Sequence, residues 1–163
     1  MNELVIINYD ALSEDSIQRN LLLAWAAGFI DGEGCIHIYK QKYNSRVSGK
    51  PGITHSLRIT IGQNNLEVLE KLAEALGVHT TLHKTKRSFE SNRQCYTLHI
   101  NGKHALEAIR RIKPYLVRKL PEAEAALRFW VEGQKDLKTG RKPVPKAVME
   151  IREWYYKKMG RLK

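Results

Sequence analysis

Two carboxylates separated by a single glycine are the first candidates for chemistry. Asp31 and Glu33 occur in the stretch Asp-Gly-Glu-Gly, directly after an apolar segment, in a chain with a positive net charge. Carboxylates at the C-terminal end of a helix are disfavoured by the helix dipole, and a divalent cation offsets that cost. Mg²⁺ takes hard oxygen ligands from one or two carboxylates together with phosphate oxygens and water. The pair therefore indicates a divalent-metal site.

Two other interpretations of the pair compete with this one. In a purely structural interpretation, a buried helix ends in a glycine-rich turn, Asp31 accepts local backbone hydrogen bonds, and Glu33 is merely exposed. A glycosidase with two catalytic carboxylates fits poorly, because Asp31 and Glu33 lie in one tight turn and cannot flank a glycosidic bond.

The composition points to one domain with a polyanionic partner. The 163-residue chain carries 28 Lys and Arg against 17 Asp and Glu, which gives a formal net charge of +11. This length suits a single compact domain with a real core. A positive surplus of this size suits nucleic acid better than an acidic small molecule.

No stretch resembles a membrane span or a secretory signal. The apolar runs stay short of the roughly 20 residues that cross a bilayer, and the first residues lack a positive flank with an apolar core. We therefore expect an intracellular protein without membrane contact, cytoplasmic in a prokaryote and organellar in a eukaryote. Cys35 and Cys95 then stay reduced. Their spacing to His37 and His99 matches no usual zinc finger or ribbon, so zinc is the weaker interpretation of these residues.

Hydrophobic periodicity predicts the elements that must position the carboxylates. Alternation predicts two hairpins, with strands at 35–40, 55–61, 78–86 and 94–100 and a loop at about 43–54 in the first hairpin. Helical stripes and end signals predict helices at about 14–32 after Ser13, at 65–76 before Gly77, at 103–112, from Pro121 onward, and after Pro145. Hairpins that alternate with helices predict the α+β class: an antiparallel sheet saddle with helices on one face.

The sheet predicted in this way has one apolar and one polar face. Alternation predicts that one set of side chains points toward the helices: Ile36, Ile38, Leu57, Ile59, Ile61, Val78, Leu82, Tyr96, Leu98 and Ile100. The other face carries His37, Tyr39, Gln41, Ser56, Arg58, Thr60, His79, Thr81, His83, Thr85, Thr97 and His99. Cations at its strand ends and turns are Lys42, Arg46, Lys84, Lys86, Arg87 and Arg93.

The polar face has a plain and a functional interpretation. Alternation usually means a solvated sheet face. A twisted antiparallel ribbon can also enter a major groove, where Arg and Gln read purine edges and lysines contact phosphates. We expect DNA contacts from the cations just named and from His37, Tyr39, Gln41, Arg58, Thr60 and His83.

Residues 23–34, Leu-Ala-Trp-Ala-Ala-Gly-Phe-Ile-Asp-Gly-Glu-Gly, resemble the LAGLIDADG motif of homing endonucleases. The chain departs from the motif at Ala26 and Ala27, which replace its first Leu-Ala, and at Glu33, where many members have Asp. The order helix, hairpin, helix, hairpin, helix extends the resemblance over about 14–135. We therefore expect one domain over 1–163, with a C-terminal helical extension at about 136–163.

The resemblance implies an enzyme that makes double-strand breaks in DNA. A chain with one motif resembles the homodimeric members, in which two motif helices cross at the two-fold axis, so a nearly palindromic double-stranded target is expected. Small residues at Ala24, Ala27 and Gly28 offer a strip for that close helix contact. The expected cofactor is Mg²⁺, with Ca²⁺ supporting binding without cleavage.

Residue roles follow from motif position. The resemblance makes Glu33 the essential metal-binding acid, adds the carbonyl of Gly32 as a ligand, and gives Asp31 a supporting role. Gln63, at the end of the second strand, resembles the polar residue that positions the attacking water. Lys119 resembles the basic residue near the scissile phosphate, with Arg118 as its nearest competitor.

Two alternatives to an endonuclease remain on this scaffold. A maturase that assists splicing of intron RNA and a DNA-binding regulator without cleavage would each use the same basic face. A structural interaction module leaves that face unexplained. A steep loss of binding with added salt, by a log-log slope of about −0.9 per phosphate contact, distinguishes a nucleic-acid binder from such a module.

Overall fold

The computed structural model of the protein describes residues 14–44, 51–85, 93–139 and 142–162. Its four strands are β1 (Gly34–Asn44), β2 (Pro51–Gln63), β3 (Thr81–Lys84) and β4 (Tyr96–Asn101). Its helices are α1 (Glu14–Glu33), α2 (Leu66–Leu76), α3 (Gly102–Ile112), α4 (Leu120–Glu132) and α5 (Lys146–Arg161), with a 3₁₀ turn at Lys113–Tyr115. The predicted Ser13 cap and the cations Arg46, Lys86 and Arg87 lie outside the described residues.

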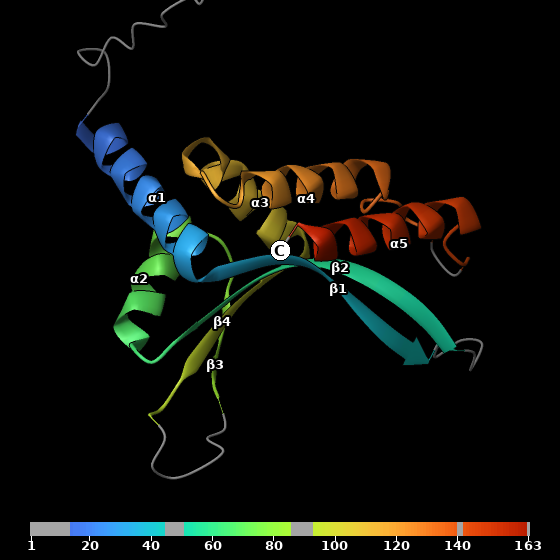
Figure 1. The fold of residues 1–163 in the computed structure, drawn as a ribbon, viewed down its shortest axis with the longest axis horizontal. Helices are drawn as coiled ribbons and strands as arrows, with labels where there is room; N and C mark the ends of the chain where they lie inside the picture. The colour runs from blue at the N-terminus through green and yellow to red at the C-terminus, as the bar shows by residue number, and fades with distance from the viewer. Residues whose placement is uncertain (1–13, 45–50, 86–92, 140–141, 163) are drawn as a thin grey trace, which may run out of the picture.

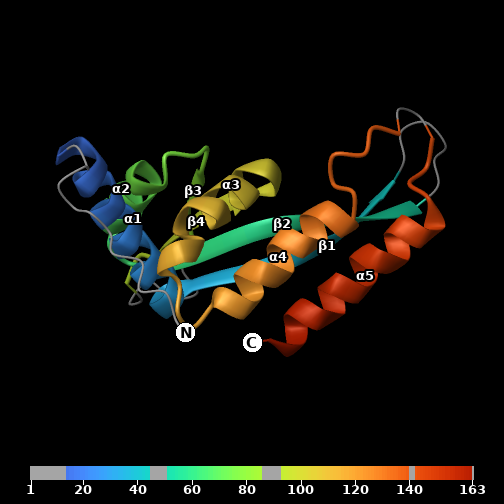
Figure 2. The same ribbon diagram turned by 90° about the horizontal axis from the view of Figure 1, so that it is seen from above.

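The strands form one antiparallel sheet in the order β1-β2-β4-β3. The sheet arches, with α1 and α2 beside one arm and α3, α4 and α5 above the other, all on the convex side (Figure 1). Seen from above, α4 and α5 run side by side next to the β1–β2 hairpin (Figure 2). The α+β saddle with helices on one face is confirmed. In the described part of the chain, no helix combines the length and apolar character that a membrane crossing requires.

The apolar face of the sheet forms the core, as alternation predicts. Ile36, Ile59, Ile61, Leu98 and Ile100 are each at most 1% exposed. Leu82 pairs with the buried Leu98 and so lies on the apolar face as predicted, but it is 39% exposed. β3 is an edge strand of only four residues, shorter than the predicted 78–86, so little structure covers this position.

The first hairpin is longer than its alternation suggests. Its strands pair from Gly34 with Ile61 to Asn44 with Pro51, so residues 43, 44 and 51–54 of the predicted 43–54 loop are strand. Gly52 faces Tyr43 across the ladder, and a Cβ at Gly52 would lie 2.7 Å from that ring. A glycine at this position therefore makes room for a tyrosine on the neighbouring strand.

The helix boundaries follow the signals in the sequence. The Asn65 side chain accepts a hydrogen bond from the Val68 N–H at the start of α2, and Gly77 ends the helix in the left-handed region at φ 58°. Pro114 falls in the 3₁₀ turn that separates α3 from α4, and Pro121 falls in the first turn of α4. The predicted stop at Gly77 and the predicted helix start at Pro121 are confirmed.

Helix α5 belongs to the core. Tyr155 and Met159 are 2% and 1% exposed, and the Tyr155 ring meets Phe129 of α4 edge-on at 6.3 Å. The buried Arg152 side chain donates from Nε to the Gly133 carbonyl at 2.7 Å and from a terminal nitrogen to the Gln134 carbonyl at 3.1 Å. The end of α4 is thus closed by a side chain from α5.

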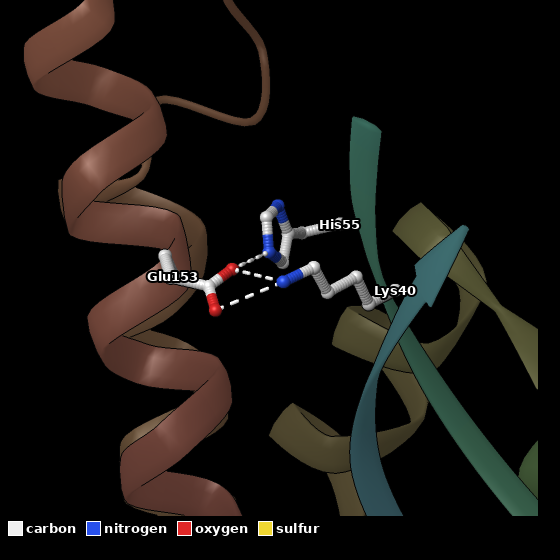
Figure 3. Close-up of polar contacts among 3 residues, drawn as sticks. All are labelled: Lys40, His55 and Glu153. Carbon is white, nitrogen blue, oxygen red and sulfur yellow. Dashed lines mark hydrogen bonds and ion pairs between the residues drawn. The ribbon is translucent and has the colours of Figure 1, made fainter. Parts of the chain in front are cut away.

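Glu153 links α5 to the first hairpin (Figure 3). Its carboxylate accepts a hydrogen bond from Lys40 Nζ at 2.9 Å and contacts His55 Nε2 at 2.9 Å. His55 is only 1% exposed, and its Nδ1 has no hydrogen-bond partner. We call these three residues the α5 clasp.

Candidate active site and nucleic-acid interface

The motif carboxylates lie where α1 passes into β1. Glu33 is the last residue of the helix and is exposed, as is Gly32. Gly34 opens the strand, and a Cβ at this position would lie 2.9 Å from the Ile30 carbonyl oxygen and 2.9 Å from Ile30 Cγ2. Glycine at position 34 therefore has a steric cause, whereas a Cβ at Gly32 would meet nothing within 4 Å.

Asp31 holds the segment that precedes α4. Its Oδ2 accepts hydrogen bonds from the backbone N–H of Val117 at 2.7 Å and of Arg118 at 3.0 Å, and its Oδ1 accepts from Lys119 N–H at 2.8 Å. The Asp31 carbonyl accepts from Arg118 Nε at 3.0 Å and from Lys119 Nζ at 2.6 Å. We call this set of contacts the Asp31 clasp.

The clasp explains why a carboxylate is tolerated at the end of α1. The three amides lie directly before α4, whose N-cap residue Lys119 makes no side-chain cap of its own. Asp31 therefore caps α4 from another helix, and the favourable N-terminal dipole of α4 offsets the unfavourable end of α1. Burial raises the pKa of Asp31, but the hydrogen bonds from the Val117, Lys119 and Arg118 amides outweigh it and lower that pKa.

Lys119 is drawn into the fold by the same contacts. It is 4% exposed, and burial, with a smaller contribution from Arg118, lowers the pKa of its ammonium group. The charges of Asp31 and then of the buried Glu122, in the first turn of α4, oppose part of this shift. An open cavity of about 200 Å³ beside these residues is lined by Gly34, Cys35, Ile36, Arg118, Lys119 and Glu122.

Gln63 lies at the same end of the sheet. β2 continues past the pair formed by Ile61 with Gly34, and Gln63 pairs with Tyr96 at the last position of the β2–β4 ladder. The structure thus brings Asp31, Arg118 and Lys119 into direct contact, with Glu33 on the same helix end and Gln63 beyond the first residue of β1.

The polar face of the sheet is a connected layer. Arg58 stacks on the Tyr39 ring at 4.2 Å and donates from Nε to Asn101 Oδ1 at 2.6 Å. On the same face, the Thr60 hydroxyl and His99 Nδ1 are 3.1 Å apart. Burial, followed by the charges of Arg58 and His83, lowers the pKa of His99. This layer lies on the concave side of the arch in Figure 1.

The register refines the predicted contact set. Within the described residues, His37, Tyr39, Gln41, Arg58, Thr60 and His83 share the polar face. Lys42 and Lys84 alternate in register with the residues of the apolar face. They reach solvent because each lies near a strand end. His79 lies before β3 and meets the His104 ring at 5.4 Å, so its placement on the sheet was wrong. Arg93 is exposed before β4.

The small-residue strip of α1 divides between two environments. Ala27 is fully buried within its own chain, whereas Gly28 is exposed and a Cβ there would meet nothing within 4 Å. Ala24 is half-buried, and Leu21, one turn earlier, is 59% exposed. The open side of α1 therefore runs from Leu21 through Ala24 to Gly28.

Sequence reasoning missed two partners of the predicted residues. Glu122 belongs to no motif. An acid in the first turn of a helix that begins at Pro121 is nevertheless a recognisable helix-start signal. The three amides that Asp31 binds lie 86 to 88 residues away and carry no signature in the sequence.

The family is settled by comparison with known sequences. The model of the LAGLIDADG endonuclease family matches residues 26–123, more than half of the chain. The chain belongs to the LAGLIDADG endonuclease family. A comparison with curated proteins gives no significant match.

Solved structures of homing endonucleases share the fold. A complex of the homing endonuclease I-CvuI with its target in the presence of calcium superposes with a TM-score of 0.57 at 21% identity, over 88% of this chain and 98% of that one. The intron-encoded I-CeuI bound to DNA gives 0.52 at 12% identity, over 83% and 76%. I-SmaMI bound to cleaved DNA gives 0.56 at 18% identity, over 80% of this chain and 41% of that one.

Proposed function

We propose that the protein is a homodimeric, site-specific homing endonuclease that hydrolyses both strands of a long, nearly palindromic double-stranded DNA target. The observation that carries this proposal is the Asp31 clasp. It fixes Arg118 and the buried Lys119 at the end of the motif helix that also bears the exposed Glu33. Cations beside a free carboxylate, at one end of a polar sheet face, suit a site that acts on a phosphodiester.

The donor chemistry at the end of α1 fits Mg²⁺. Among the described residues no three His, Cys, Asp or Glu side chains gather as a metal site. Mg²⁺ does not require such a cluster. It binds through one or two carboxylates and completes its coordination shell with phosphate and water oxygens. Glu33 and the Gly32 carbonyl would hold the ion. When bound, Mg²⁺ polarises the phosphate and favours ionisation of a bound water.

The neighbouring residues take distinct roles in this proposal. Both carboxylate oxygens of Asp31 already accept backbone hydrogen bonds, so Asp31 acts as a positioning residue more than as a ligand. Lys119, with its lowered pKa, exchanges a proton more readily than a solvated lysine. Gln63 offers an amide to orient water. Arg118 contributes charge at the phosphate.

The dimer follows from the single motif and the open side of α1. Two copies that meet along Ala24 and Gly28 bring two Glu33 carboxylates to one axis, and such an isologous contact matches a near-palindromic target. We expect Gly28→Arg to give a monomer by sedimentation, with its circular dichroism unchanged, because a side chain at position 28 meets nothing in its own chain. Ala147→Arg, at an exposed position of α5, is the control. A Gly28→Arg protein that stays dimeric would contradict this interface.

The decisive experiment compares cleavage with binding. A supercoiled plasmid carries the sequence obtained by joining the DNA that flanks the gene's host intron or insertion. Wild-type protein should linearise it in Mg²⁺ and only bind it in Ca²⁺, while Glu33→Gln should bind but lose cleavage by at least about 100-fold. Tight binding by the wild type without any cleavage would instead favour a regulator. Preferential binding of intron RNA would favour a maturase.

A further inference from the structure

We propose that the groove between the edge strand β1 and helix α5 is a second DNA-contacting surface, which binds the phosphodiester backbone flanking the central target. The proposal rests on the function proposed above for its partner, DNA. The groove has a volume of about 500 Å³, and its walls include His37, Tyr39 and Lys40 from β1 and Tyr156, Lys157 and Gly160 from α5.

The exposed lining of the groove suits a phosphate backbone. Lys157 is exposed, Tyr156 is 38% exposed, and Lys40 Nζ lies 5.3 Å from the centre of the Tyr156 ring. None of the described residues that line the groove is acidic. Lys157 and the Tyr156 hydroxyl are the groups that donate hydrogen bonds to phosphate oxygens here, because the Lys40 ammonium group is already paired with Glu153. The apolar lining residues Ile38 and Met159 are 4% and 1% exposed, so an apolar ligand would find little surface.

The groove is continuous with the polar face of the sheet. His37 and Tyr39 line the groove and also belong to the polar layer, where Arg58 stacks on Tyr39 at 4.2 Å. β1 is an edge strand, so no further strand of the sheet lies outside it. A duplex on the concave side that extends past the β1 edge therefore meets this groove, whose other wall, α5, lies on the convex side. This continuity favours DNA over a separate RNA or peptide partner.

The groove is formed in advance of binding. The α5 clasp fixes the spacing of its two walls, since Glu153 bonds to Lys40 and His55 across the helix–sheet contact (Figure 3). Its floor is the buried pair Ile38 and Met159. At its mouth, a Cβ at Gly160 would meet nothing within 4 Å. A side chain can therefore be placed there without disturbing the fold.

The test uses a target duplex isolated by binding selection from random DNA, so that it requires no cleavage. Affinity is measured by fluorescence anisotropy for that duplex and for the same duplex extended by about one helical turn, or 10 bp, at each end. The variants are Lys157→Glu and Gly160→Glu. The control is Lys146→Glu, the same charge change on the same helix, at a side chain that is 92% exposed and outside the groove.

We expect both groove variants to weaken binding of the extended duplex by about five- to tenfold and to reduce its salt slope by about one contact, or 0.9. The short duplex and the control should change by less than about twofold. Equal effects of Lys157→Glu and Lys146→Glu on the extended duplex would overturn the proposal. So would an equal loss on short and extended duplexes, or a loss confined to RNA. Flank-dependent binding without cleavage by wild-type protein would reject the endonuclease and keep the groove.

Discussion

Two carboxylates each fasten a helix to a distant part of the chain, and they do so differently. Asp31 binds three consecutive backbone amides, whereas Glu153 binds two side chains, Lys40 and His55. A carboxylate on amides fixes the path of a backbone. A carboxylate between side chains holds two surfaces together through charge, and that contact depends on pH and salt. The first arrangement suits a site that must keep its geometry, and the second suits a helix–sheet joint.

Replacing the carboxylates should show the difference most strongly in stability. We expect Asp31→Ala to lower the free energy of unfolding by about 2–4 kcal/mol, because three amides lose their acceptor and α4 loses its cap. Glu153→Ala should cost about 1 kcal/mol, since its pair with Lys40 is partly solvated. Urea titrations of both variants provide the measurement. A larger loss for Glu153→Ala would reverse the comparison.

The glycine beside the Asp31 clasp sharpens the comparison. Gly34→Ala should cost about 1–3 kcal/mol, because its Cβ would lie 2.9 Å from backbone and side-chain atoms of Ile30. Gly32→Ala serves as the matched control in the same motif, since a Cβ there meets nothing within 4 Å and alanine favours the helix. Thermal unfolding of the two variants provides the measurement. An equal loss of stability in both variants would contradict the steric role of Gly34.

The smallest expected effect separates the two clasps by pH. Burial lowers the pKa of His55 below its ordinary 6.5, although Glu153 opposes this. The unfolded chain then binds more protons than the native state, so stability present above pH 6.5 is lost as pH falls through the lowered native pKa. The pKa of Asp31 is lowered below its ordinary value of 3.8. The stability that the Asp31 clasp contributes is therefore lost only as the pH falls below 3.8.

We therefore expect the melting temperature of the wild type to fall as the pH drops below 6.5, and His55→Gln to reduce that slope. His99, whose pKa is also lowered, contributes to the same window, so His99→Gln serves as a second variant. A wild-type slope that His55→Gln leaves unchanged would assign the dependence to another group.

Local patterns predicted the elements and the two faces of the sheet. Alternation in β1, β2 and β4 put Ile36 inside and Tyr39 outside, because the period of a strand is a property of the backbone alone. Alternation could not predict the exposure of Leu82, because its burial depends on a neighbouring strand that the edge strand β3 lacks.

The candidate site was only partly predictable. The motif identified Glu33 and Asp31, but it gave no hint that Asp31 binds the amides before α4 or that Lys119 is buried by that contact. Such pairs depend on how distant elements meet in three dimensions, which no local period encodes. The supporting role expected for Asp31 stays a prediction.

The packing of α5 has a consequence for how the protein is made. Arg152 satisfies carbonyls at the end of α4, and Tyr155 and Met159 fill the core beside Phe129. A nascent chain that has emerged only as far as α4 would leave those carbonyls unpaired and that apolar surface open to water. The complete core can therefore form only after α5 has left the ribosome, so a polypeptide shortened before this helix is expected to be a substrate for chaperones and proteases.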